Sequence, residues 1–245
     1  DRRLLASGVF DFQLASSTPL ESAGSHSVVV QVTTNGALTG GDTMSVDVSV
    51  GAGTATGGGT DYTFNPTTVT FTSADVSGAG TFSKNVSLSV NDDRRLEGNE
   101  TVRLDLSNPQ QTGGHTVGLG VTTQHTATID DNDTGVINFQ TDQSNAESVD
   151  PTVNAVLTIT GSGSGTVGLD TAISVTASNL GTGTTVAADL STPFGTPLLT
   201  FAAGDADGSN NITSNNATID VNDDQRLEGD ETVRLLIGSL SSTLN

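Results

Sequence analysis

The chain contains the same sequence twice, and this internal repeat limits its fold more than any other feature. Residues 90–104 read VNDDRRLEGNETVRL and residues 221–235 read VNDDQRLEGDETVRL, at an offset of 131 positions. Upstream, GVFDFQ at 8–13 corresponds to GVINFQ at 135–140, at an offset of 127. The order of the segments is kept while the offset drifts. This pattern indicates two homologous domains with small insertions, and not a short solenoid repeat.

Each copy has the pattern of a succession of short strands. In the first copy, β-branched residues alternate or cluster between breaks rich in Gly, Asn, Asp and Ser. No segment keeps the i, i+3, i+4, i+7 apolar spacing of a helix over a dozen residues. With about seven strands per copy, we predict an all-β fold of two tandem antiparallel β-sandwiches of the immunoglobulin-like type, arranged end to end. The expected strands of the first copy are 27–33, 43–50, 67–72, 81–90, 101–106 and 125–129.

The two domains are predicted to be 1–133 and 134–245. Their linker, DNDTG at 131–135, is short and has no Pro- or Ser-rich spacer, so limited freedom between the domains is expected. The second domain reaches residue 245 without a counterpart of the last strand of the first domain. Aromatic residues are only 4% of the chain, so aliphatic residues must fill most of both cores. The residues expected inside the first domain are Phe12, Val30, Val46, Phe71, Val86, Leu88, Val102 and Leu104.

The charge of the chain excludes several classes of partner. Twenty-eight acidic and eight basic residues give a formal net charge of −20, which is unsuited to nucleic acid or to an anionic membrane surface. No apolar run reaches 18 residues, so no membrane insertion is expected. There is no Cys, which excludes disulfides and thiolate metal sites. All six Glu residues fall at paired positions of the repeat, namely 21 and 147, 97 and 228, and 100 and 231.

The acidic residues outside the strands are concentrated in a few loops. Loops after alternate strands of an antiparallel sandwich lie at one end, so these carboxylates are expected to meet there, where they would repel one another. Calcium relieves this repulsion because it takes 6–8 oxygen ligands at about 2.3–2.6 Å, whereas magnesium keeps its waters in a strict octahedron. Two or more calcium ions are expected. The candidate ligands are Glu21, Asp61, Asp92, Asp93, Glu97, Asp131 and Asp133.

The order of these motifs resembles a known family. GTDY at 59–62, DDRRLEGNE at 92–100 and IDDND at 129–133 are similar to the motifs of the Calx-beta domain, a calcium-binding sandwich of sodium/calcium exchangers and of many bacterial surface proteins. The resemblance covers nearly all of residues 8–133 and, in truncated form, 135–245. It implies calcium bound by loops at one tip of the sandwich. It also adds the amide oxygen of Asn132 to the ligands of the first domain.

In the second copy the resemblance is less complete. Leu190 stands where the first copy has Tyr62, and the closing acidic triplet is absent, so a weaker or incomplete site is expected. The ligands implied there are Glu147, Asp189, Asp223, Asp224 and Glu228. Further candidates in the two copies are Glu100, Asp130 and Glu231.

Other interpretations of these residues stay open. The Asp-Asp-x-x-x-Glu segment is also compatible with a solvated hairpin loop. Glu100 and Glu231 begin a strand, where each can pair with an arginine three residues later. The three His residues have no zinc or catalytic-triad spacing and are expected on the surface or in strands. No motif favours an enzyme.

The predicted function is therefore that of a non-enzymatic, calcium-stabilised structural or adhesive module of an extracellular or cell-surface protein, of bacterial type by its Lys-poor composition. Calcium is expected to stiffen the joint between the domains. The alternative is a regulatory calcium-sensor pair of the exchanger type. The strand missing from 134–245 is expected either from further repeats of the chain or from a neighbouring copy, and the second route would join molecules head to tail into a fibre.

Overall fold

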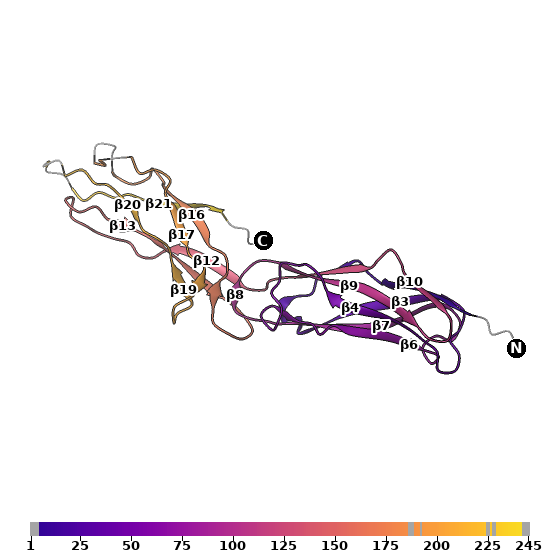
Figure 1. The fold of residues 1–245 in the computed structure, drawn as a ribbon. Helices are drawn as coiled ribbons and strands as arrows, with labels where there is room; N and C mark the ends of the chain where they lie inside the picture. Colours follow the sequence, from indigo (N-terminus) through magenta and orange to yellow (C-terminus); the bar gives the residue numbers. More distant parts are fainter. Residues whose placement is uncertain (1–4, 186–188, 192, 224–225, 227–228, 242–245) are drawn as a thin grey trace. The chain divides into compact units, whose positions relative to one another are not determined.

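In the computed structural model, the regular secondary structure of the described residues consists of strands and one short 3-10 turn, η1 (Glu21–Ala23) (Figure 1). It describes residues 5–185, 189–191, 193–223, 226 and 229–241. The predicted all-β, sandwich-type fold is confirmed. The packing divides the chain into two compact units. The first unit comprises the residues up to Asp92 together with Asn99–Asn132, and the second comprises Asp93–Gly98 together with the residues from Asp133 onward.

The first unit consists of two five-stranded sheets. One has the order β10-β1-β3-β7-β5 and the other β2-β11-β9-β4-β6. Neighbouring strands are antiparallel, except that β10 runs parallel to β1 and β2 parallel to β11. The strands are β1 (Ser7–Phe12), β2 (Ser16–Ser17), β3 (Ser25–Asn35), β4 (Thr43–Val50), β5 (Tyr62–Thr63), β6 (Thr67–Thr72), β7 (Ala79–Val90), β9 (Glu100–Gln111), β10 (Thr116–Leu119) and β11 (Gln124–Ile129).

The alternating residues of these strands form the core between the two sheets. In β4, Met44, Val46 and Val48 point inward and are fully buried, whereas the residues between them face outward. Phe10 of one sheet meets Phe71 of the other, with ring centroids 6.1 Å apart. All eight residues predicted for this core are buried. Each of the six predicted strands is present, and β9 continues five residues beyond the expected end.

The second unit repeats this plan with shorter strands. Its sheets have the orders β12-β14-β19, β13-β20, β17-β16-β21 and β18-β15-β8. The strands are β8 (Arg95–Leu96), β12 (Thr134–Phe139), β13 (Thr152–Val153), β14 (Ala155–Thr160), β15 (Gly168–Leu169), β16 (Ile173–Asn179), β17 (Leu198–Phe201), β18 (Gly204–Asp205), β19 (Asn211–Thr213), β20 (Ala217–Thr218) and β21 (Leu235–Ser241).

Strand β8 comes from the acidic loop of the first repeat but belongs to the second unit. It pairs in parallel with β15, so that Arg95 lies opposite Gly168 and Leu96 opposite Leu169. Leu96 is buried in the second core. The Arg95 guanidinium forms ion pairs with Asp170 and, at 2.9 Å, with Asp205. The sequence pattern does not predict that a strand from the first repeat pairs within the second unit, because β8 is only two residues long and shows no alternation of apolar and polar residues.

The repeat is preserved down to single backbone contacts. Gly53 lies against the backbone at Thr101, whose carbonyl oxygen accepts hydrogen bonds from the amides of the two residues after Gly53. Gly183 lies in the same way against Thr232. A Cβ at either glycine would overlap the carbonyl oxygen, which is backbone and cannot rotate away. Only glycine therefore fits these two positions.

We accordingly expect Gly53→Ala and Gly183→Ala each to lower the free energy of unfolding by about 1–3 kcal/mol, the usual cost of overpacking. The matched control is Gly41→Ala, where an added Cβ meets nothing within 4 Å. Urea unfolding of the three variants measures the difference. A stability loss in the control as large as in the other two variants would contradict this explanation.

Asp75 and Lys84 form a surface ion pair at 2.9 Å beside β6 and β7. The hydrogen bond from Lys84, followed by the one from the Thr72 amide, lowers the pKa of Asp75 from 3.8 to about 2. A lowered carboxyl pKa stabilises the folded state above the unfolded value, and this contribution is lost as the pH falls towards 2. The stability difference between the native chain and Asp75→Asn is therefore expected to be small at pH 7, under about 1 kcal/mol, and to vanish as the pH falls through and below about 2. Acid titrations of both proteins, followed by circular dichroism, test this; a difference that grows towards pH 2 would contradict it.

Candidate metal centre

The loop that precedes β5 fixes the position of Asp61. The Asp61 amide donates a hydrogen bond to the Thr56 carbonyl at 3.0 Å, and the Asp61 carboxylate accepts one from the Thr56 amide. The Asn91 amide donates to the Asp61 carbonyl at 2.9 Å, which attaches this loop to the end of β7. Asp61 is buried as a result. A buried carboxylate held by its own loop is a preformed oxygen ligand.

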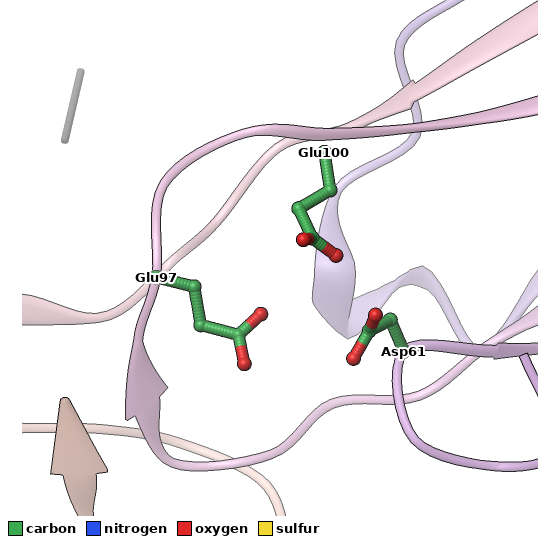
Figure 2. Close-up of side chains that lie close together, drawn as sticks. All are labelled: Asp61, Glu97 and Glu100. Atoms are coloured by element: carbon green, nitrogen blue, oxygen red, sulfur yellow. The ribbon is translucent and has the colours of Figure 1, made fainter. Parts of the chain in front are cut away.

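Two more carboxylates meet Asp61. One ligand atom from each of Asp61, Glu97 and Glu100 lies within 4.8 Å of the other two, and Figure 2 shows the three side chains pointing toward one another. Glu100 is the first residue of β9, as expected. The arginine three residues later, its alternative partner, instead forms an ion pair with Asp105 at 3.0 Å. Glu100 is thus placed as a candidate ligand.

Hydrogen bonds bring most of the other predicted acidic segments of the first repeat together. The amide of Glu21, a buried residue of η1, donates to the Asp130 carbonyl at 3.0 Å. The Asn132 side chain donates to the Asp92 carboxylate at 3.0 Å. The Asp131 amide donates to the side chain of Asn99, in the loop before β9, at 3.2 Å. The turn before β3, the loop before β9 and the segment after β11 are therefore connected to one another.

Asp93 and Asp133 have different surroundings. The Asp93 carboxylate accepts a hydrogen bond from the Arg95 amide at 2.8 Å. The buried Asp133 carboxylate accepts one from the Ser162 amide at 3.0 Å, and it lies so close to Gly161 that a side chain there would overlap it. Both carboxylates therefore help to hold backbone of the second unit.

The second copy does not gather its acidic residues in the same way. Glu147, Asp223 and Glu231 are exposed, and Asp189 is half-buried with its carbonyl accepting the Asn222 amide at 2.9 Å. Within the described part of this copy, no three acidic or His side chains converge on one point. Two of its predicted ligands, Asp224 and Glu228, lie outside the described residues.

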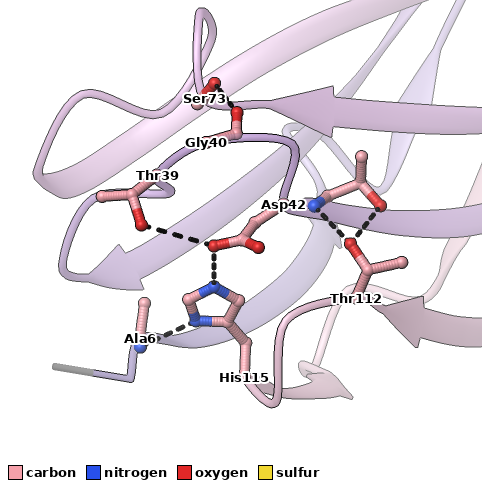
Figure 3. Close-up of polar contacts among 8 residues, drawn as sticks. Ala6, Thr39, Gly40, Asp42, Ser73, Thr112 and His115 are labelled. Carbon is pink, nitrogen blue, oxygen red and sulfur yellow. Dashed lines mark hydrogen bonds and ion pairs between the residues drawn. The ribbon is translucent and has the colours of Figure 1, made fainter. Parts of the chain in front are cut away.

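The His residues take structural positions. His26 and His125 lie in strands, as expected, and each ring contacts the Ser17 hydroxyl at 2.8 Å. The pKa of His26 is lowered by burial and, to a smaller extent, by His125. The expectation for His115 is wrong, because this residue is buried just before β10. Its Nδ1 accepts the Ala6 amide at 2.9 Å, so its Nε2 carries the proton and donates to the Asp42 carboxylate at 3.1 Å (Figure 3). His115 thereby holds the chain where it enters β1.

The first repeat therefore presents a set of candidate oxygen donors for a cation. Carboxylates and an amide suit a hard divalent cation, and neither thiolate nor imidazole is part of the group of three. Three carboxylates this close repel one another, and a cation at their centre would reverse that repulsion. The donor set thus fits calcium.

Fold and donor set together define a tandem β-sandwich with a candidate metal centre in the loops of its first repeat. The family model of the Calx-beta domain matches residues 6–133 and again 130–245, so the chain belongs to the Calx-beta family, whose domains bind calcium.

The solved structures that are similar to this chain include a single CBD1 domain and two structures of CBD12. The apo form of the Calx CBD1 domain is 24% identical to this chain. The match spans 53% of this chain and 99% of the CBD1 chain, with a TM-score of 0.42. The calcium-binding domain CBD12 of CALX1.1 is 19% identical. The match spans 86% of this chain and 74% of the CALX1.1 chain, with a TM-score of 0.42. CBD12 from CALX1.2 is 20% identical, with coverages of 94% and 80% and a TM-score of 0.39. No curated protein sequence matches significantly.

Among the described residues, the structure contains no helix of the length and apolar character that a membrane crossing needs.

Proposed function

We propose that this chain is a calcium-binding structural module of an extracellular or cell-surface protein, in which calcium stiffens the segments that join the two units. The observation that carries the proposal is the convergence of Asp61, Glu97 and Glu100, whose ligand atoms lie within 4.8 Å of one another. Glu97 and Glu100 are separated by only two residues, whereas Asp61 comes from a different loop. A site assembled from distant loops is what a folded scaffold provides and an unfolded chain lacks.

The remaining ligands are proposed on the hydrogen-bonded segments around this group. Glu21, Asp92, Asp131 and Asn132 would supply further oxygens, enough for two ions with 6–8 ligands each when backbone carbonyls and water are included. Asp130 contributes its carbonyl to the same hydrogen-bond system. Asp93 and Asp133 remain ligand candidates through their carboxylate oxygens, which also accept hydrogen bonds from the amides of Arg95 and Ser162.

The link between calcium and the joint follows from where the chain passes from one unit to the other. It does so between Asp92 and Asp93, between Gly98 and Asn99, and between Asn132 and Asp133. Each of these peptide bonds lies in a segment that carries proposed ligands. Ions held by these segments would therefore restrict their backbone angles, and removing the ions would release mutually repelling carboxylates.

Calcium titration of the intact chain by calorimetry tests this proposal. We expect saturable binding, and we expect Asp61→Asn and Glu97→Gln each to weaken it at least tenfold, because each loses a charged ligand without a change of size. Asp142→Asn is the matched control, since it removes the same charge from an exposed loop position. Equal affinities for all four proteins would show that calcium, if it binds, does not use this group.

The alternative function is a regulatory calcium sensor of the exchanger type, which membership of the Calx-beta family supports. The same titration distinguishes the two functions. Sensors bind calcium with dissociation constants of about 10⁻⁷–10⁻⁵ M, and extracellular modules at about 10⁻⁴–10⁻³ M. The extracellular assignment, with an adhesive role and a bacterial source, is supported by a composition with one Lys and 29 Gly.

Head-to-tail assembly of copies into a filament is a further part of the extracellular interpretation, in which one molecule would add a strand to a sheet of the next. Light scattering at increasing protein concentration tests it, and a constant monomer mass would exclude it.

A further inference from the structure

Two of the three His residues contact the same hydroxyl group, although they are far apart in the sequence. The Nε2 atoms of His26 and His125 each lie 2.8 Å from the Oγ atom of Ser17. His26 belongs to β3, His125 to β11 and Ser17 to β2. Strand β3 lies in one sheet of the first unit, whereas β2 and β11 lie in the other. The packing of the two sheets therefore brings two imidazole nitrogens to a single point.

The hydrogen bonds define which ring nitrogens carry protons. His125 Nδ1 lies 2.7 Å from the Leu14 carbonyl oxygen, which can only accept, so His125 Nδ1 is the protonated nitrogen of that ring. In the neutral ring, His125 Nε2 is then an acceptor, and it receives the hydrogen bond of the Ser17 hydroxyl. The Ser17 oxygen accepts in turn from His26, so the His26 ring carries its proton on Nε2.

This group of side chains is held firmly on one side and is open to solvent on the other. His125 is buried, and its ring packs against Phe12 with ring centroids 5.7 Å apart. Ser17 and His26 are half-buried, and the residues on both sides of Ser17 are exposed. The pKa of His26 is lowered by burial and, to a smaller extent, by His125, so the His26 ring is neutral at neutral pH. A fixed imidazole and an accessible neutral imidazole thus face the same point.

A tetrahedral metal ion fits the same three atoms after a small adjustment. Zinc bonds to His nitrogen at about 2.0–2.1 Å, which places neighbouring ligand atoms about 3.3 Å apart. The two nitrogen-to-oxygen distances are 2.8 Å, so each has to widen by only about 0.5 Å. The His125 Nδ1 hydrogen bond to the Leu14 carbonyl is of the kind that orients metal-bound imidazoles. In His26, the ring proton has to move from Nε2 to Nδ1, which leaves the charge of the ring unchanged.

We propose that Ser17, His26 and His125 form a binding site for a divalent transition-metal ion of the zinc type, separate from the candidate calcium ligands. Two imidazole nitrogens and one hydroxyl oxygen are three ligands, and water completes the tetrahedron. Imidazole suits zinc, copper and nickel, whereas calcium takes oxygen ligands. His125 is the second residue of β11, whereas Asp131 and Asn132 follow the end of this strand. An ion at this site would join β3 of one sheet to β2 and β11 of the other.

Zinc titration of the intact chain, in saturating calcium so that carboxylates with calcium affinity are occupied, tests the proposal. NMR of the imidazole nitrogens reports which nitrogen of each ring carries a proton or a metal ion. Without zinc, we expect the proton of His26 on Nε2 and that of His125 on Nδ1. With zinc, both rings should bind through Nε2 and carry their protons on Nδ1. His115 is the internal reference and should not change, because it is buried and both of its ring nitrogens are hydrogen-bonded.

Calorimetry of the same titration adds a variant with a matched control. His26→Gln removes one nitrogen ligand at a half-buried position and keeps a side chain that can hydrogen-bond to Ser17. We expect it to weaken zinc binding tenfold or more. The control, Ser16→Ala, removes a hydroxyl group from the adjacent, exposed position of β2 and should leave the affinity unchanged.

Three results would overturn the proposal. The first is that zinc leaves the ring nitrogens of His26 and His125 unchanged, and the second is that His115 changes equally. The third is that His26→Gln binds zinc as tightly as the native chain, which would place the ion on the carboxylates instead. The NMR measurement uses the native chain, so its outcome does not depend on how well the variant folds.

Discussion

Removal of calcium is expected to lower the melting temperature of this protein by on the order of 10 °C. A ligand present at about 100 times its dissociation constant stabilises the folded state by about 2.7 kcal/mol per site. Domains of this size have total stabilities of only about 5–15 kcal/mol, and each lost kcal/mol lowers the melting temperature by several degrees. The three converging carboxylates Asp61, Glu97 and Glu100 add their mutual repulsion once no cation lies between them.

Differential scanning calorimetry in calcium and after exhaustive chelation measures this effect. The Asp61→Asn variant should melt in calcium nearly as the chelated native protein does, and it should respond less to chelator. The Asp142→Asn control should behave like the native chain, because its side chain is exposed and outside the group. A melting curve that chelation does not change would refute the calcium proposal for this chain.

The second large effect is expected from Leu96→Ala. Leu96 belongs by sequence to the acidic loop of the first repeat, but its side chain is buried in the core of the second unit. Truncating a buried Leu costs about 2–5 kcal/mol, through lost apolar contacts and the cavity left behind. This cost should fall on the second unit. Leu14→Ala is the matched control, because Leu14 is 61% exposed and should change stability by less than about 0.5 kcal/mol.

Hydrogen exchange resolved by strand locates the loss. In Leu96→Ala we expect faster exchange in β14 and β16, whereas β3 and β4 of the first unit should keep their protection. The opposite distribution, with the first unit weakened and the second unaffected, would show that β8 does not contribute to the second core.

Strand positions and the first core were predictable because their signal is local. In β4, every second residue is apolar, and a period of two places those residues on one face wherever the strand is packed. The same signal identified Phe71, Val102 and Leu104 as core residues. His115 shows the limit of such reasoning, because its burial depends on Ala6 and Asp42, which are remote in sequence.

The candidate metal centre was predictable in part. The paired Glu positions and the double-Asp loop pointed to the segments that carry the candidate ligands, and Glu100, only a further candidate by sequence, is one of the three residues whose carboxylates converge. The sequence did not separate Asp93 and Asp133 from the others. Their carboxylates hold the amides of Arg95 and Ser162, and such contacts depend on how the second unit packs around residues 93–98.

By itself, the sequence determined two sandwich domains of the Calx-beta type, the residues of the first core and the acidic segments of the candidate site, because repeats and strand periods are properties of neighbouring residues. Only the tertiary structure decided that Asp61, Glu97 and Glu100 converge and that β8 pairs with β15 of the second unit. The reason is physical: both arrangements join residues far apart in the chain, and packing alone brings such residues into contact.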